Sequence, residues 1–133
     1  MTEATPLSAL DQNAAEQQIL KETGNAALKA GSFEAAIAAY TKALALDPER
    51  KLASASALLG NRALAQLKLK KHEACVDDCT AALTLDPGYG KALYRRAQAR
   101  EALDKLSDAF TDLRMLLNLE PSNKEAQLSL IHI

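Results

Sequence analysis

Small and apolar residues recur at fixed distances before three prolines, and the recurrence predicts packed helices. The prolines Pro48, Pro87 and Pro121 each follow a Leu-x-Leu-acid sequence and stand 39 and then 34 residues apart. Twelve, eight and five residues before each proline the side chain is small, apolar or aromatic. Because offsets of four and three residues lie on one face of an α-helix, each such segment is expected to be helical. The proline then ends the helix, since it has no N–H to donate and clashes with the preceding turn.

A second helix is expected before each of these. A small residue stands 24 positions before each proline, among good helix formers, at Gly24, Ala63 and Ala97. The pattern predicts an all-α fold of three helix-turn-helix repeats plus a short C-terminal capping helix, stacked as a right-handed α-solenoid. The expected helices are about 13–30, 33–46, 50–69, 72–85, 89–103, 106–119 and a last one from 122. Residues 1–12 are expected to be a flexible tail, and 13–133 one domain with repeats at about 17–50, 51–89 and 90–123.

Composition narrows the function classes. Of the 133 residues, 48% are hydrophobic and only 4% aromatic, which suits helices packed closely through small side chains. The formal net charge of −1 gives no overall basic field for nucleic acid or an anionic membrane. No segment reaches the roughly 18 apolar residues of a membrane span, and residues 1–13 lack a signal-peptide layout. With two cysteines and no secretory signal, we expect a protein of the reducing cytoplasm.

Groups that could carry chemistry have simpler explanations in the repeat. His72, Cys75 and Cys79 share one helical stripe, but no fourth metal ligand is evident, and both cysteines stand at expected core positions. Asp77 and Asp78 are expected to be solvated rather than catalytic. No nucleophile, base and orienting group stand together at plausible positions. We therefore expect no enzymatic activity, no cofactor and no metal.

The first helix of each pair carries polar residues at positions outside the packing pattern. Lys21 and Asn25 are four residues apart, Asn61 lies on the third helix, and Lys91 and Arg95 are again four apart on the fifth. If the helices stack as the repeat demands, these five side chains project into one concavity from three successive layers. Three are cationic, two are amides and none is acidic, so the set is suited to hold carboxylates.

Residues 16–121 resemble the tetratricopeptide-repeat (TPR) family, whose repeat is 34 residues long. The polar set resembles the carboxylate-clamp TPR domains of co-chaperones. Their first helix carries Lys-x-x-Gly-Asn, their third Asn-Arg and their fifth Gly-Lys-x-x-x-Arg, and the matching segments here are 21–25, 61–62 and 90–95. The resemblance implies that the five polar residues grip the C-terminal Glu-Glu-Val-Asp of heat-shock protein 90 or heat-shock protein 70.

The same resemblance implies further contacts and a narrower family. It implies that Leu28 and Leu64 lie against the apolar side chain preceding the terminal Asp, and that Lys68 lies near the upstream acidic residues. Residues 91–96 and the five-residue extension before Asn61 resemble the TPR domain of the UCS family, the myosin-directed co-chaperones. Immunophilins and mitochondrial-import receptors share parts of the pattern. A client protein would then bind through regions outside this chain. The alternative is a TPR scaffold that binds another acidic peptide or oligomerises.

Overall fold

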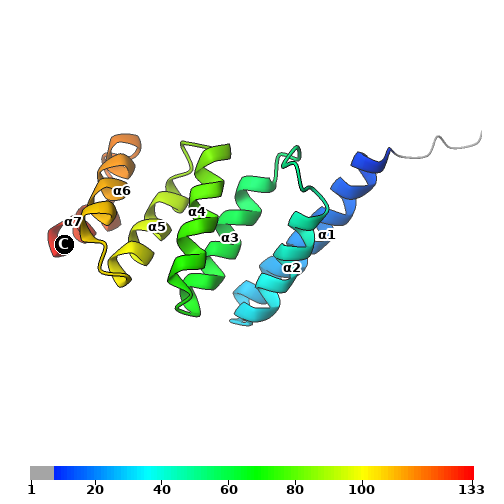
Figure 1. Ribbon diagram of the computed structural model, residues 1–133, viewed down its shortest axis with the longest axis horizontal. Helices are drawn as coiled ribbons and strands as arrows, with labels where there is room; N and C mark the ends of the chain where they lie inside the picture. Colours follow the sequence, from blue (N-terminus) through cyan, green and yellow to red (C-terminus); the bar gives the residue numbers. More distant parts are fainter. Residues whose placement is uncertain (1–7) are drawn as a thin grey trace, which may run out of the picture.

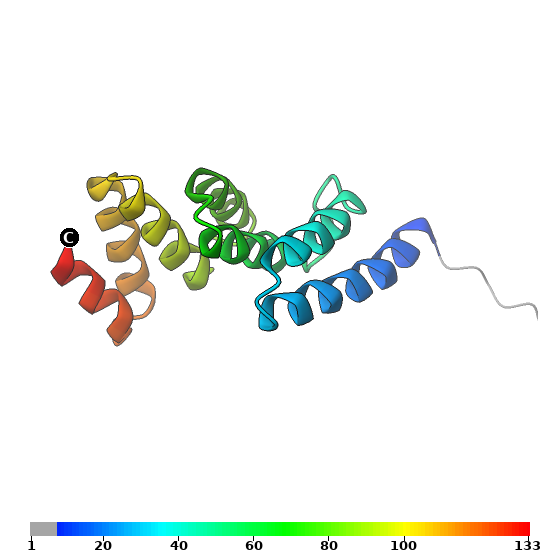
Figure 2. The ribbon, with the colours of Figure 1, turned by 90° about the horizontal axis from the view of Figure 1, so that it is seen from below.

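The computed structural model describes residues 8–133, and within this range every regular element is an α-helix (Figure 1). Each helix pair packs on the next, and α1 and α7 lie at opposite ends of an elongated array (Figures 1 and 2). The predicted all-α stack of three helix pairs and a final helix is confirmed. The helices are α1 (Ala9–Lys29), α2 (Phe33–Ala45), α3 (Ala55–Lys68), α4 (His72–Leu85), α5 (Gly90–Ala102), α6 (Leu106–Leu119) and α7 (Lys124–His132).

The first helix begins earlier than predicted. Ser8 caps it, because the Ser8 hydroxyl oxygen accepts a hydrogen bond from the backbone N–H of Asp11 at 3.1 Å. Residues 9–12 are therefore helical, and their assignment to a flexible tail was wrong. The hydrophobic pattern starts later than the cap, so it could not locate this boundary. Residues 1–7 of the predicted tail lie outside the described residues.

The third helix begins later than predicted, at Ala55 rather than residue 50. The buried carboxylate of Asp47 accepts hydrogen bonds from the backbone N–H groups of Lys51 at 2.8 Å and Leu52 at 2.9 Å. Arg50 has a φ of 56°, in the left-handed region that does not continue a helix. These contacts fold the residues between α2 and α3 into a loop, which accommodates the five extra residues of the first repeat spacing.

The core consists of the residues that the repeat pattern selected. All nine residues at the twelve, eight and five positions before the prolines are buried. Gly24 is needed where it stands, because a β-carbon there would lie 2.5 Å from the ring of Tyr40. At the far end, Ala126 of α7 is buried against α6, and Leu130 and Ile133 pack on the same cluster, so α7 caps the third pair as predicted. Among the described residues, no helix combines the length and apolarity of a bilayer span.

Arginine side chains join one repeat to the next. Arg62 of α3 donates two hydrogen bonds to the carboxylate of Asp78 in α4, at 2.6 and 2.7 Å, and a third to the Thr41 hydroxyl of α2 at 3.2 Å. The prediction that Asp78 is solvated was wrong, because only 7% of this residue is exposed. Its neighbour Asp77 is exposed, as predicted.

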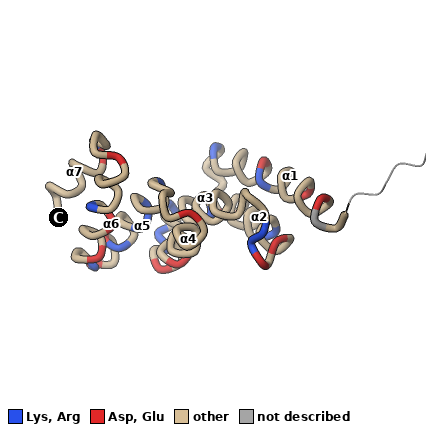
Figure 3. The backbone as a smooth tube through the Cα atoms, turned by 90° about the horizontal axis from the view of Figure 1, so that it is seen from above, with Lys and Arg blue, Asp and Glu red and all other residues tan. Residues whose placement is uncertain are grey.

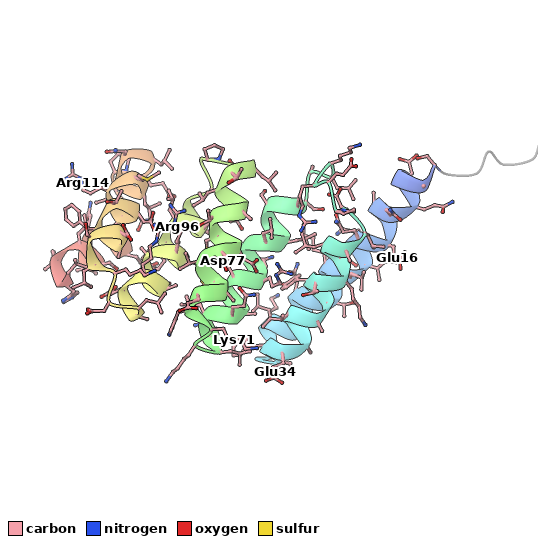
Figure 4. All side chains as sticks on the ribbon, viewed as in Figure 1. Glu16, Glu34, Lys71, Asp77, Arg96 and Arg114 are labelled. Carbon is pink, nitrogen blue, oxygen red and sulfur yellow. The ribbon has the colours of Figure 1, made fainter. Side chains whose placement is uncertain are left out.

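The third repeat contains the same arrangement. Arg96 of α5, labelled in Figure 4, donates to the Asp112 carboxylate of α6 at 2.6 and 3.0 Å, and to the Thr80 hydroxyl of α4 at 3.1 Å. Arg100 adds another bond to Asp112 at 2.8 Å. Arg62 and Arg96 therefore each tie both helices of their own repeat to the second helix of the repeat before it.

Candidate functional site

The first helices of the three pairs form a common layer. The middle one, α3, contacts both α1 and α5 directly, although α2 and α4 intervene in the sequence. Basic residues occur on all three of these helices (Figure 3). The predicted site residues therefore come from neighbouring elements, with Lys21 and Asn25 on α1, Asn61 on α3, and Lys91 and Arg95 on α5.

Hydrogen bonds connect the two asparagines and the arginine of this set to adjacent helices. The Asn61 Nδ2 donates to the Asn25 Oδ1 at 3.3 Å, which joins α3 to α1. The Arg95 Nη1 donates to the backbone carbonyl oxygen of Gly60 at 2.8 Å, which joins α5 to α3. The structure thus brings together Asn25, Asn61 and Arg95, three of the five residues expected to share one concavity. Among the described residues, no hydrogen bond joins Lys21 or Lys91 to these three.

Tyr40 of α2 belongs to the same network, although the sequence pattern assigned it only to the core. Its hydroxyl donates to the Asn25 Oδ1 at 2.5 Å. Burial raises the pKa of the Tyr40 phenol, while the charge of Arg95 and a hydrogen bond with Asn61 act in the opposite direction. The group therefore stays protonated and remains a donor at neutral pH. A buried tyrosine needs a partner for its hydroxyl, which is the signal that could have identified this contact.

The three cations of the set differ in exposure but share one property. Lys91 is exposed, and Lys21 and Arg95 are half-buried. None of them forms an ion pair within residues 8–133, whereas Arg62, Arg96 and Arg100 all do. Their charges are therefore not paired directly with a carboxylate in this range. Beside Lys91 and Arg95, a hollow of about 930 Å³ opens toward the start of α7, and its lining includes the acidic residues Asp86, Glu120 and Glu125.

The three remaining predicted residues follow the asparagines along their helices. Leu28 stands three residues after Asn25 and is half-buried on the core. Leu64 stands three residues after Asn61 and is also half-buried, and Lys68 is exposed one turn further on. Residues three and four apart share one side of a helix. Each asparagine is thus followed by a leucine on its own side.

The two cysteines lie in the core behind this layer, where the Cys75 thiol donates to the backbone carbonyl oxygen of Arg95 at 3.8 Å. Cys75 and Cys79 are fully buried in the core, with their sulfur atoms 4.0 Å apart and both thiols free. Their hydrogen bond and burial raise the pKa of the Cys79 thiol far above its ordinary value. In the described part of the chain, no group of three or more His, Cys, Asp or Glu side chains is placed to hold a metal ion.

Known proteins resemble the chain in sequence. Models of the tetratricopeptide repeat match residues 17–50 and 56–89. The mitochondrial import receptor subunit TOM70 of Rattus norvegicus is 40% identical over 124 residues, covering 93% of this chain and 20% of the relative. RNA polymerase II-associated protein 3 of Mus musculus is 44% identical over 108 residues, covering 81% of this chain and 16% of the relative. The chain spans about a fifth or less of these curated relatives.

Solved structures resemble it over most of its length. The first TPR domain of Spaghetti (RPAP3), bound to the heat-shock protein 90 peptide SRMEEVD, is 40% identical with a TM-score of 0.82, covering 89% of this chain and 90% of that one. The second TPR domain of human RPAP3, in complex with the heat-shock protein 70 peptide SGPTIEEVD, is 39% identical with a TM-score of 0.80, covering 92% and 96%.

A further solved structure concerns the narrower family that the sequence suggested. The myosin chaperone UNC-45 from C. elegans, in complex with an Hsp90 peptide, is 37% identical with a TM-score of 0.82, covering 87% of this chain and 13% of that one. This likeness is similar in degree to that of the RPAP3 domains, so it does not single out the myosin-directed co-chaperones. The repeat models, the helix pairs and these likenesses together establish that the chain belongs to the tetratricopeptide-repeat family.

Proposed function

We propose that the chain is a non-enzymatic adaptor that binds the C-terminal Glu-Glu-Val-Asp tail of heat-shock protein 90, heat-shock protein 70 or both. The observation that carries the proposal is the set of three cations without a carboxylate partner in the described residues, beside two hydrogen-bonded asparagines, on three neighbouring helices. Two similar TPR domains were solved with peptides that end in this sequence, which supports the same ligand here.

Each predicted residue has a role in the proposed site. Lys21, Asn25, Asn61 and Lys91 would hold the carboxylates of the terminal Asp, and Arg95 would pair with an acidic side chain or the peptide backbone. A free chain end with an acidic last residue presents two carboxylates at once, which matches a cluster of charged and amide donors. Leu28 and Leu64 would receive the apolar side chain before the terminal Asp, and Lys68 would lie near the upstream acidic residues.

The expected affinity is moderate. Each hydrogen bond to a charged group contributes about 1.5–3 kcal/mol. After the loss of translational freedom and the ordering of the peptide, a handful of such bonds leaves roughly micromolar affinity, or about −8 kcal/mol. Binding of this strength suits an adaptor that exchanges partners.

The proposal also includes a cellular location and further binding partners. A cytoplasmic location is supported by two buried cysteines with free thiols, which a reducing compartment maintains. A client protein would be bound by regions outside this chain. No nucleic-acid or membrane partner is proposed, since the net charge is −1.

A second candidate function uses the same fold as a scaffold. Large apolar side chains are exposed on the last two helices, including Phe110 at 43%, Leu128 at 57% and Ile131 at 74%. Such a surface favours oligomerisation or another partner at the α6–α7 end. Charge removal at Lys91 separates the two functions, because only the peptide site depends on that ammonium group.

Calorimetric titration with an acetylated Met-Glu-Glu-Val-Asp peptide and its C-terminally amidated twin tests the proposal. We expect roughly micromolar binding of the free acid and much weaker binding of the amide, because amidation removes one of the two terminal carboxylates. A folded, helical sample that binds neither peptide would rule out the chaperone tail as ligand and leave the scaffold function.

A further inference from the structure

Tyr40 and Tyr89 pack in the same way against two glycines of the first helices. A β-carbon at Gly24 would lie 2.5 Å from the Tyr40 ring, and one at Gly60 would lie 2.5 Å from the Tyr89 ring. The two tyrosines differ at the hydroxyl group. That of Tyr40 donates to the Asn25 Oδ1 at 2.5 Å, whereas that of Tyr89 has no hydrogen bond to any described residue.

The Asn25 amide has two chemically opposite ends, and its surroundings distinguish them. Its Oδ1 accepts hydrogen bonds from both the Tyr40 hydroxyl and the Asn61 Nδ2. Its Nδ2 donates to no described residue, so the two N–H groups are available to a ligand. The torsion that exchanges the ends of an asparagine amide is soft. Without a fixed partner, the amide could turn its oxygen outward, where it would repel a carboxylate.

We propose that Tyr40 is a positioning residue, whose buried hydroxyl holds the Asn25 amide with its N–H groups directed toward the carboxylate of a bound peptide. The proposal rests on the proposed function, because it takes a carboxylate as the ligand. Tyr40 is fully buried on α2, the second helix of its repeat, and therefore acts through Asn25 without touching the peptide. The hydroxyl thus sets the direction of a binding group in addition to packing in the core.

A double-mutant cycle tests this role. Calorimetry would measure the affinity for the free-acid peptide in the wild type, Tyr40→Phe, Asn25→Ala and the double variant. We expect the single substitution Tyr40→Phe to raise the dissociation constant about tenfold over that of the wild type. In a protein that already carries Asn25→Ala, the same substitution should have no further effect. Tyr89→Phe is a control for stability alone, since it removes a hydroxyl without a hydrogen bond to the described residues, but the Tyr89 side chain lines the hollow beside Lys91 and Arg95. Thermal unfolding confirms that each variant is folded.

Several results would overturn the proposal. Wild-type affinity in Tyr40→Phe would show that the hydroxyl does not contribute to binding. An equal loss in the presence and absence of the Asn25 side chain would assign the effect to general packing. A wild-type protein that does not bind the free-acid peptide would instead remove the proposed function, and this proposal with it.

Discussion

Two sets of basic residues project from the first helices of the repeats, and their surroundings differ. Arg62 and Arg96 each lie 2.6 Å from an aspartate carboxylate on the second helix of the same repeat. Lys21, Lys91 and Arg95 form no ion pair with any carboxylate among the described residues. The paired arginines hold helices together, whereas the other three cations are unpaired in this part of the chain and are the candidates for binding a ligand. In this fold, the neighbours of a charge separate structural residues from candidate binding residues better than its residue type does.

The two sets are also distributed differently along the array. The arginine–aspartate pair occurs only in the second and third repeats, because Thr23 and Ala39 stand at the corresponding positions before the first proline. The first repeat instead carries Lys21 and Asn25 on α1. The first repeat therefore carries candidate ligand donors without a paired arginine, while α5 of the third repeat carries both kinds of residue.

The largest expected effect follows from removing the acidic partner of the structural set. Asp112→Ala leaves Arg96 and Arg100 without their carboxylate, whose side chain is only 1% exposed. We expect the free energy of unfolding, measured by urea denaturation, to fall by about 3–5 kcal/mol. The exposed Asp77→Ala is the control and should stay within about 0.5 kcal/mol of the wild type. A similar small change for both variants would mean that the buried pair does not hold the repeat.

Adjacent arginines on α5 allow the sharpest comparison of the two sets. Arg95→Met should weaken peptide binding by about 2 kcal/mol, the contribution of one hydrogen bond to a charged group. Its effect on the free energy of unfolding should be small. Arg96→Met should lower the free energy of unfolding by more than Arg95→Met does, and should leave the affinity of the folded protein nearly unchanged. Calorimetry and urea denaturation of both variants provide the four values. Similar losses of stability and of affinity in both variants would contradict the distinction between a structural and a ligand-binding arginine.

Salt should affect the two sets unequally. Raising the ionic strength from about 0.1 M to about 0.5 M shortens the Debye length, so the exposed Lys91 and half-buried Lys21 attract a carboxylate less strongly. We expect the dissociation constant of the free-acid peptide to rise by about fivefold, while the buried arginine–aspartate pairs are screened much less. An affinity that does not change with salt would argue against binding through these cations.

The smallest expected effect concerns the contact between successive repeats. Thr80→Val removes the hydroxyl that accepts a hydrogen bond from Arg96 at 3.1 Å while keeping the side-chain shape. Because Thr80 is exposed and water can replace the bond, the free energy of unfolding should fall by only about 0.5–1 kcal/mol. Peptide affinity should stay at the wild-type value. A loss of several kcal/mol would mean that this single bond dominates the contact between repeats.

The helix pairs and their core could be predicted because they depend on periodicity within the sequence. Ala36, Cys75 and Ala109 are buried because small residues at these repeat positions let two helices approach closely, as the pattern predicted. The boundaries of α1 and α3 could not be predicted in the same way. They depend on individual side chains, namely the Ser8 cap and the Asp47 carboxylate, which act outside the hydrophobic pattern.

Contacts between helices were harder to foresee than the helices themselves. The pairing of Arg62 with Asp78 spans 16 residues and two helices, and so does that of Arg96 with Asp112. The equal spacing of these arginines and aspartates in two repeats was a usable signal of ion pairs. It would have corrected the prediction that Asp78 is solvated. The network of Tyr40, Asn25 and Asn61 has no such repeated spacing. The need of a buried tyrosine for a hydroxyl partner signals a contact, but the identity of that partner depends on how α1, α2 and α3 meet in three dimensions.

The central claim is that unpaired cations on the first helices bind the terminal carboxylates of a peptide. The most direct measurement is calorimetry of the free-acid and amidated Met-Glu-Glu-Val-Asp peptides with the wild type and with Lys21→Met/Lys91→Met, which keeps two aliphatic stems and removes two charges. We predict that the wild type strongly prefers the free acid, and that the folded double variant binds both peptides with the same weak affinity. A double variant that retains the wild-type preference for the free acid would contradict the claim.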